Sequence, residues 1–254
     1  MTSTLQAGPR TRTVPTTRSS RHAVLIALLG VLLLQSPHLL WASHFSWLGH
    51  SADVPAGSTS LGPFVPTFYR ILDEASPEWA RDTPGEPLLS HDGRVIARVG
   101  AAFKQRVDVE GSARLRDGRV VNLDEPVGGR PRYLVVRNAP FGVGVPGYKL
   151  IPYRTVAVDP RRIKPGTVLY VPALTGITLP SGEVHDGFCF AHDVGHGIIG
   201  NRVDIFVGFE SDRDNTFTRS YRIASQEPVR VYRVGGAVAR SVNERFKRDF
   251  AWHE

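Results

Sequence analysis

The sequence has very little cysteine and contains no internal repeat, coiled-coil heptad or nucleophile-elbow motif. Cys189 is the only cysteine, so no disulfide can form within the chain, and cysteine usage does not indicate a redox compartment. Its apolar surroundings, FCFA, favour a small buried hydrophobe over a nucleophile. The absence of an elbow motif leaves a serine or cysteine nucleophile without support.

Acidic residues are missing from the first 52 positions, which explains much of the positive charge. The whole chain carries a formal charge of +7, and residues 1–52 contribute four arginines, so about +3 (7 minus 4) remains for the rest. No basic stripe is interleaved with aromatic residues. This pattern predicts no nucleic-acid partner and is compatible with an anionic polymer.

The N-terminus has the features of an export signal. Residues 1–21 form a basic polar arm, and residues 22–42 contain the apolar run AVLIALLGVLLL. A basic segment before a short apolar run is typical of a signal peptide, while 22–42 is almost long enough for an uncleaved signal anchor. No cysteine follows the run, which excludes a lipoprotein anchor. We therefore expect an exported protein of the periplasm or cell envelope, associated with the inner membrane in the anchor alternative.

The remainder is predicted to be a linker followed by one β-rich domain. Residues 43–63 are rich in Ser, Gly, Pro and Ala, and residues 64–254 contain many short alternating segments separated by Gly turns. Helical periodicity is limited to a short segment within 70–80 and a final helix at 241–252. Such a pattern favours a barrel or sandwich. The predicted strands are 67–72, 94–100, 105–111, 119–123, 132–137, 155–159, 167–173, 187–193, 202–209 and 229–234.

Three aspartates stand out by their context. Asp159 ends a predicted strand just before a proline, Asp193 closes FCFAHD, and Asp204 lies inside RVDIFVG. Asp159 and Asp193 could equally be turn residues. Alternation places Asp193 on the face of Cys189 and Ala191. Asp204 is harder to explain, because an ionised carboxylate within an apolar strand is costly unless it is satisfied. It is either paired with an arginine such as Arg202 or a working acid.

A glycine-rich connector joins the last two of these strands. Gly195, Gly197 and Gly200 would allow tight turns and the close approach of a bulky ligand. His192 and His196 have the i, i+4 spacing of helical zinc motifs. Glycines flank His196, and no Glu follows His192, so the helix that such a site requires is not expected. We predict no metal and no cofactor.

Two segments together resemble a known family. TVAVDPRRIKPGTVLYVP and AHDVGHGIIGNRVDIFVG are similar to the three-aspartate (3D) domain of the membrane-bound lytic transglycosylase A family and of stationary-phase survival-type cell-wall proteins. Upstream, VEGSARLRDGRVVN resembles a further stretch of the transglycosylases. The likeness covers about residues 105–234 and is strongest over 153–209. It implies an all-β fold, a six-stranded double-psi β-barrel with inserted hairpins, such as 173–187, and a short C-terminal helix.

The resemblance also implies a function. It suggests an exported peptidoglycan lytic transglycosylase that cleaves the β-1,4 bond between N-acetylmuramic acid (MurNAc) and N-acetylglucosamine (GlcNAc), leaving 1,6-anhydroMurNAc. Asp204 would be the single acid/base, Asp193 its neighbour in the catalytic site, and Asp159 an orienting carboxylate. The glycan strand would bind near Gly195, His196, Gly197, Gly200 and Ser112. The alternatives are a non-catalytic glycan-binding barrel and a polysaccharide hydrolase.

Overall fold

The computed structural model describes residues 53–250, apart from residues 146, 196 and 213. The predicted basic arm, the signal segment and the first ten residues of the predicted linker lie outside the described residues. Within the described part, no helix combines the length and the apolar character needed to cross a membrane.

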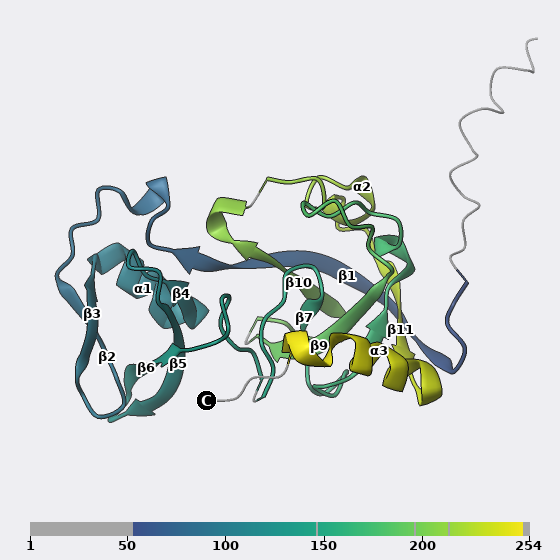
Figure 1. The fold of residues 1–254 in the computed structure, drawn as a ribbon, viewed down its shortest axis with the longest axis horizontal. Helices are drawn as coiled ribbons and strands as arrows, with labels where there is room; N and C mark the ends of the chain where they lie inside the picture. The colour runs from purple at the N-terminus through teal and green to yellow at the C-terminus, as the bar shows by residue number, and fades with distance from the viewer. Residues whose placement is uncertain (1–52, 146, 196, 213, 251–254) are drawn as a thin grey trace, which may run out of the picture. The chain divides into compact units, whose positions relative to one another are not determined.

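Six strands close into a β-barrel (Figure 1). Around the barrel their order is β10, β7, β9, β8, β11, β1, and a pairing between β1 and β10 completes the ring. The β1–β10 and β7–β9 pairs are parallel and the other four are antiparallel, so the barrel is mixed. The predicted six-stranded barrel is confirmed. Its strands are β1 (Ser58–Asp73), β7 (Thr155–Val158), β8 (Val168–Tyr170), β9 (Phe188–Val194), β10 (Arg202–Phe209) and β11 (Val229–Val234).

Alternating apolar residues fill the interior of this barrel. Val156 and Val158 point inward from β7, and Val203, Ile205 and Val207 do so from β10. Intervening residues of both strands therefore face outward. Because Asp204 lies between Val203 and Ile205, its side chain belongs to the outer face of the barrel.

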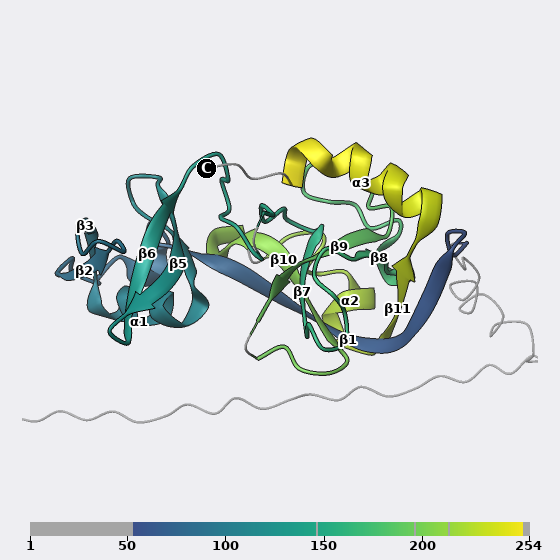
Figure 2. The same ribbon diagram turned by 90° about the horizontal axis from the view of Figure 1, so that it is seen from below.

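A second sheet lies between β1 and β7 in the chain (Figure 2). It has its own core, in which Leu88, Val99, Phe103 and Val107 are fully buried. The C-terminal end of β1 pairs with β4, so one long strand belongs to both the barrel and this sheet. The range 64–254, predicted as a barrel domain, thus also contains this sheet. The second sheet consists of β4 (Ser112–Arg114), β5 (Val120–Val127) and β6 (Arg130–Val136). The same part of the chain carries η2 (Pro77–Trp79), the separate two-stranded sheet of β2 (Glu86–Leu89) and β3 (Val95–Val99), and helix α1 (Ala101–Glu110).

The strand predicted at 105–111 is wrong, because these residues belong to helix α1. Phe103 and Val107, four residues apart, are both buried on one helix face. The carboxylate of Asp82 accepts the backbone N–H of Phe103 at 2.7 Å and caps the first turn from outside the helix. Gly111, at φ +80°, ends the helix in the left-handed conformation.

Two further predictions near β1 need correction. Residues 58–63, predicted as linker, form the start of β1, and the helix expected within 70–80 is reduced to the 3-10 turn Pro77–Trp79. Backbone pairing of β1 with β11 along its first half and with β10 along its second half outweighs the turn-forming composition. The register shift between Ser60 and Gly62 accommodates the glycine as a bulge.

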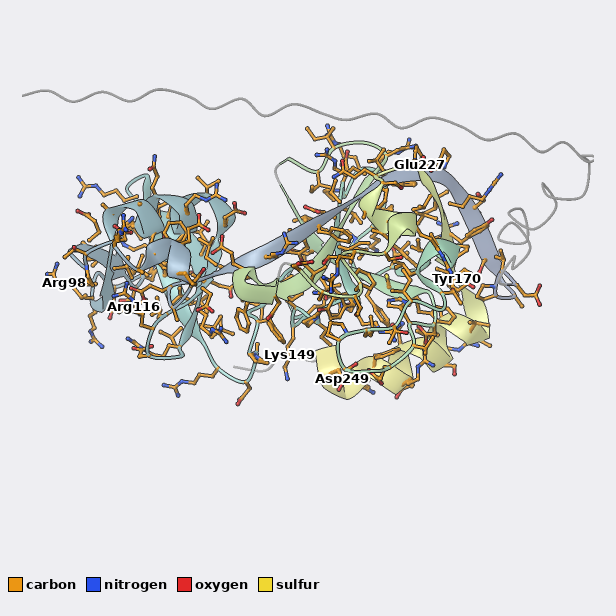
Figure 3. All side chains as sticks on the ribbon, turned by 90° about the horizontal axis from the view of Figure 1, so that it is seen from above. Arg98, Arg116, Lys149, Tyr170, Glu227 and Asp249 are labelled. Carbon is orange, nitrogen blue, oxygen red and sulfur yellow. The ribbon has the colours of Figure 1, made fainter. Side chains whose placement is uncertain are left out.

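The predicted C-terminal helix is present and begins earlier, as α3 (Gly236–Phe250). Its apolar residues Val238, Val242 and Phe246 belong to one cluster with Tyr170 of β8 and Phe190 of β9. Figure 3 shows the side chain of Tyr170 on β8, that of Arg98 on β3 and that of Arg116 in the turn between β4 and β5. The remaining short elements are η3 (Pro172–Leu174), η4 (Glu210–Asp212) and α2 (Tyr221–Ala224).

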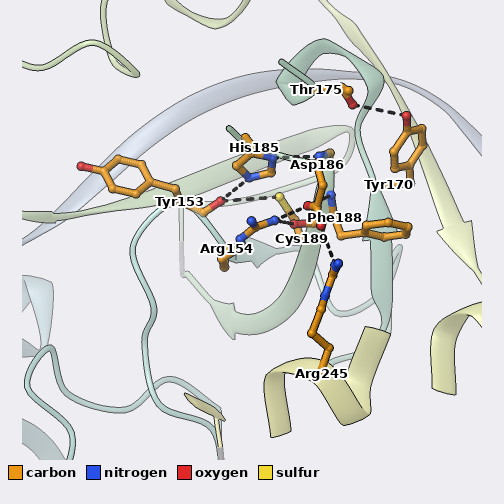
Figure 4. Close-up of polar contacts among 10 residues, drawn as sticks. Tyr153, Arg154, Tyr170, Thr175, His185, Asp186, Phe188, Cys189 and Arg245 are labelled. Carbon is orange, nitrogen blue, oxygen red and sulfur yellow. Dashed lines mark hydrogen bonds and ion pairs between the residues drawn. The ribbon is translucent and has the colours of Figure 1, made fainter. Parts of the chain in front are cut away.

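A network of polar contacts joins the predicted 173–187 insertion to the barrel and to α3 (Figure 4). Asp186 forms ion pairs with Arg154, which precedes β7, and with Arg245 of α3. His185 is fully buried. Its Nδ1 accepts the N–H of Gly187 at 2.9 Å, so its Nε2 donates to the carbonyl of Tyr153 at 2.8 Å. Burial lowers the pKa of His185 to about 4, and the ring is neutral at pH 7.

Candidate active site

Asp204 and Asp193 lie in one row on the outer face of the barrel. Asp204 of β10 is in register with Ala157 of β7, and Ala157 is in register with Asp193 of β9. On the other side, Asp204 is in register with Thr67 of β1. Residues in register on neighbouring strands point to the same face, so a single small side chain separates the two carboxylates.

A β-bulge in β9 brings Asp193 to this face. Thr155 is paired with Phe190, and Ala157 with Asp193, so two steps along β7 correspond to three along β9. The extra residue moves Asp193 from the inward face of Cys189 and Ala191 to the outer face. The alternation expected for this strand is therefore wrong at its end, because the bulge shifts the period by one residue.

Tyr69 is a site residue that the sequence did not indicate. Its hydroxyl donates a 2.7 Å hydrogen bond to Oδ2 of Asp193. Burial and the neighbouring Asp193 carboxylate hold the pKa of Tyr69 well above its usual value, so the phenol stays protonated. Burial raises the pKa of Asp193 to about 6, although the Tyr69 hydroxyl opposes the shift. The Asp204 carboxylate adds to it.

The environment of Asp204 favours the protonated form of its carboxyl group. Burial raises its pKa, while the Thr67 hydroxyl, Arg202 and Arg70 oppose the shift. Its Oδ1 is buried and has no hydrogen-bond partner among the described residues. Arg202 and Arg70 thus favour the ionised form of Asp204, as a paired structural anion would require, while burial favours the protonated form.

Asp204 opens into a cleft of about 430 Å³ between the barrel and the second sheet. Apart from Asp204 itself, its walls carry two cations and two acids, so charged side chains surround the carboxyl group of Asp204. The other lining residues are Phe68, Tyr69, Arg70, Ile71 and Leu72 of β1, Arg106 and Glu110 of α1, and Glu210 of η4. A groove lined in this way can hold a polar ligand against a protonated carboxyl group.

Contacts between the two sheets brace the cleft. The indole N–H of Trp79 donates to Oε2 of Glu210 at 3.1 Å. The guanidinium of Arg114 pairs with Asp73 and lies 3.5 Å from the ring centre of Phe209. These contacts join the C-terminal ends of β1 and β10 to the part of the chain that forms the other wall of the cleft.

Asp159 is buried but occupied with local hydrogen bonds. Its Oδ2 accepts the backbone N–H of Gly200 at 2.9 Å, and its Oδ1 accepts both the backbone N–H and the Nε–H of Arg161. Led by the Gly200 N–H, these donors lower the pKa of Asp159 to about 2. Asp159 is therefore ionised near neutral pH, and it fastens the glycine-rich connector to the turn after β7.

The structure brings only part of the predicted glycan-binding set near the aspartates. Gly200, at φ +70°, donates to Asp159, and Gly195 lies where a Cβ would come within 2.9 Å of Ile198. Gly197 has open space around it. His196 lies outside the described residues. Ser112 is buried in β4 and is not among the residues that line the cleft.

No group of three potential metal ligands gathers among the described residues. His185 and His192 are both buried, and burial lowers the pKa of His192 to about 3. The ring of His192 stacks on Tyr148, with ring centres 3.7 Å apart. In the described part of the chain, both histidines therefore pack as neutral rings.

Comparison with known proteins supports the relationship indicated by the sequence. Residues 154–222 match the family model of the 3D domain. No curated protein matches the chain.

Solved structures of lytic transglycosylases are similar to the chain at low identity. E. coli MltA with bound chitohexaose is 16% identical over 70% of this chain and 75% of its own, with a TM-score of 0.43. The membrane-bound lytic murein transglycosylase of Agrobacterium tumefaciens is 16% identical over 74% and 78%, with a TM-score of 0.39. LtgG of Burkholderia pseudomallei is 17% identical over 70% and 72%, with a TM-score of 0.35. Residues 154–222, which match the 3D domain, contain Asp159, Asp193 and Asp204.

Proposed function

We propose that this protein is an exported lytic transglycosylase that cleaves the β-1,4 bond between MurNAc and GlcNAc in peptidoglycan and leaves a 1,6-anhydroMurNAc end. The observation that carries the proposal is the state of Asp204. It is a carboxyl group with a raised pKa and an unpartnered buried oxygen, it lines an open cleft, and it lies in a 3D domain.

One carboxyl group is sufficient for this reaction. Protonated Asp204 donates its proton to the glycosidic oxygen, and the bond from that oxygen to C1 of MurNAc breaks. The C6 hydroxyl of the same sugar attacks C1, and ionised Asp204 accepts the hydroxyl proton. The proton returns to Asp204, no water is consumed, and the second carboxylate of an ordinary glycosidase is not required.

The neighbouring residues would keep Asp204 in its working state. Asp193 lies in the same row across Ala157, where the Asp204 charge raises the pKa of Asp193, and Tyr69 fixes the orientation of Asp193. Asp159 would act as a positioning residue, since it holds the connector through Gly200. The glycan strand would lie along the cleft, with the connector glycines at one side.

Digestion of purified murein sacculi by residues 43–254 tests the proposal. Mass spectrometry of the products should detect 1,6-anhydromuropeptides, and Asp204→Asn should reduce their release by at least about a hundredfold, the scale of general acid–base catalysis. A folded protein that releases no anhydro products, or an Asp204→Asn variant that is fully active, would exclude this function.

The same digestion separates the two alternatives. A polysaccharide hydrolase would produce reducing ends and incorporate oxygen from ¹⁸O-labelled water. A non-catalytic glycan-binding barrel would be retained by sacculi in a pull-down without releasing any muropeptide.

A further inference from the structure

Two charged residues of α1 form one wall of the cleft. Arg106 and Glu110 both line it, and their side chains form an ion pair at 2.8 Å. Glu110 is the last residue of the helix, because Gly111 takes φ +80° and its N–H bonds to the carbonyl of Val107. The helix end therefore places Glu110 at the cleft, on the wall that the second sheet contributes.

We propose that Glu110 is a positioning residue for Asp204, and that Arg106 is its counter-ion. The charge of Glu110 adds to the effect of burial and favours the protonated form of Asp204, which donates its proton to the glycosidic oxygen. This role rests on the proposed function, in which Asp204 of the barrel is the proton donor. Glu110 lies outside the barrel and would influence that proton donor from the other wall of the cleft. The second sheet would then supply more than a wall for the glycan.

The cations around Asp204 favour its ionised form, and a nearby anion opposes their effect. Arg70 and Arg202 both stabilise its ionised form, which could not act as an acid. Glu110 on α1 opposes them. Asp204 is thus held between cations on the barrel and an anion on the second sheet. The charged and titratable groups around it are Tyr69 and Arg70 of β1, Arg106 and Glu110 of α1, Asp193 of β9, Arg202 of β10 and Glu210 of η4.

Arg106 decides how much of the Glu110 charge reaches Asp204. The side chain of Arg106 is 53% exposed and that of Glu110 is 36% exposed, so water screens the pair without removing its effect. Neutralising Glu110 removes an anion beside Asp204. Neutralising Arg106 instead leaves that anion unpaired. The two variants should therefore shift the titration of Asp204 in opposite directions.

The pH dependence of anhydromuropeptide release tests this opposition. Activity should fall as the pH rises through the pKa of Asp204, because only the protonated acid can donate. We expect Glu110→Gln to move this basic limb down by about half a pH unit, and Arg106→Gln to move it up by a similar amount. High salt should reduce both shifts. Glu110→Asp, which retains the charge, should keep the wild-type limb.

Glu244→Gln is a matched control, since Glu244 forms an exposed ion pair with Lys247 on α3. It should leave the profile unchanged. Circular dichroism of each variant establishes that it is folded. Movement of both limbs in the same direction, or of neither, would overturn the role of Glu110.

A measurement that does not depend on enzymatic activity separates the role of Glu110 from the proposed function. A ¹³C NMR titration follows the carboxyl carbon of Asp204, whose resonance is the one absent from Asp204→Asn. The midpoint should fall in Glu110→Gln and rise in Arg106→Gln. If sacculi yield no anhydro products and the midpoints still move, the function fails and the electrostatic coupling stands. Unmoved midpoints in an active enzyme would overturn the coupling alone.

Discussion

Asp193 and Asp204 occupy one row of the barrel surface, and only Ala157 lies between them. The small side chain of Ala157 is 3% exposed, so the two carboxyl groups frame a filled position with little space for a larger residue. The spacing of the two acids therefore depends on a residue that has no chemistry of its own.

Ala157→Leu should separate the two carboxyl groups and reduce activity by at least about tenfold. Overpacking of this kind typically costs about 1–3 kcal/mol in the free energy of unfolding. The measurements are anhydromuropeptide release and denaturant unfolding. Ala157→Ser, which adds one oxygen atom, is the control and should keep most activity. Full activity in a stably folded Ala157→Leu variant would contradict the importance of this row.

Tyr69→Phe should raise the pKa of Asp193. The phenol donates a hydrogen bond that stabilises the ionised carboxylate, and its removal leaves only the backbone N–H of Val194 to oppose the effect of burial. A ¹³C titration of the Asp193 carboxyl carbon should show a midpoint above the present value of about 6. We expect a several-fold loss of activity with the fold intact. An unchanged midpoint would mean that the hydrogen bond does not form in solution.

Asp193 should also make stability depend on pH. Its pKa is about 6 in the folded protein, against about 3.9 in an unfolded chain, so the folded state retains the proton more strongly. The contribution of Asp193 to the free energy of unfolding should therefore be greatest below pH 4 and fall by about 2 kcal/mol as the pH rises from 4 to 6. Urea denaturation at a series of pH values measures this.

Asp193→Asn should remove that fall, whereas Glu244→Gln should retain it. Asp159 acts in the opposite sense, because its folded pKa of about 2 is below the unfolded value. Its stabilising effect is complete above about pH 4 and is lost as the pH falls toward 2. A wild-type curve with no loss of stability between pH 4 and 6 would contradict the raised pKa of Asp193.

Gly200 and Gly197 should respond differently to substitution by alanine. Gly200 has φ +70° and holds Asp159, so Gly200→Ala should cost about 1 kcal/mol in the free energy of unfolding. Gly197 has a negative or extended φ and open space, so Gly197→Ala should leave stability nearly unchanged. If Gly197→Ala nevertheless weakens binding to sacculi, its predicted contact with the glycan gains direct support. Equal stability of the two variants would contradict the backbone conformation at Gly200.

The sequence predicted the barrel well, since β7, β9 and β10 combine apolar alternation with clear turns. It failed at 105–111, because the alternation in QRVDVEG is typical of a strand. In the structure these residues belong to a helix, and Phe103 and Val107 on one face of that helix pack into an apolar core. Local alternation does not show which part of the chain a segment will pack against, and this packing decides whether the segment forms a helix or a strand.

The sequence predicted the acidic residues of the candidate site, but it did not indicate the residues that surround them. Asp193 and Asp204 carry their own local signal, a charge at the end of or within an apolar strand. Tyr69 and Glu110 reach the site only through the long-range pairing of β1 with β10 and the turn after α1. The bulge in β9 also has no sequence signature, and it alone decides that Asp193 faces outward.

The long strand β1 has a consequence for how the protein acquires activity. Its residues 65–71 pair in parallel with 202–209, more than 130 positions later in the chain, and its last two residues pair with β4. Contacts of such separation form slowly, because a long loop must close first. Until they form, the barrel remains open, the cleft has one wall, and Asp204 is exposed to water with an ordinary acidity. Refolding should therefore recover the second sheet before any enzymatic activity. Asp204 would acquire its raised pKa only when β1 pairs with β10, in the last step of folding.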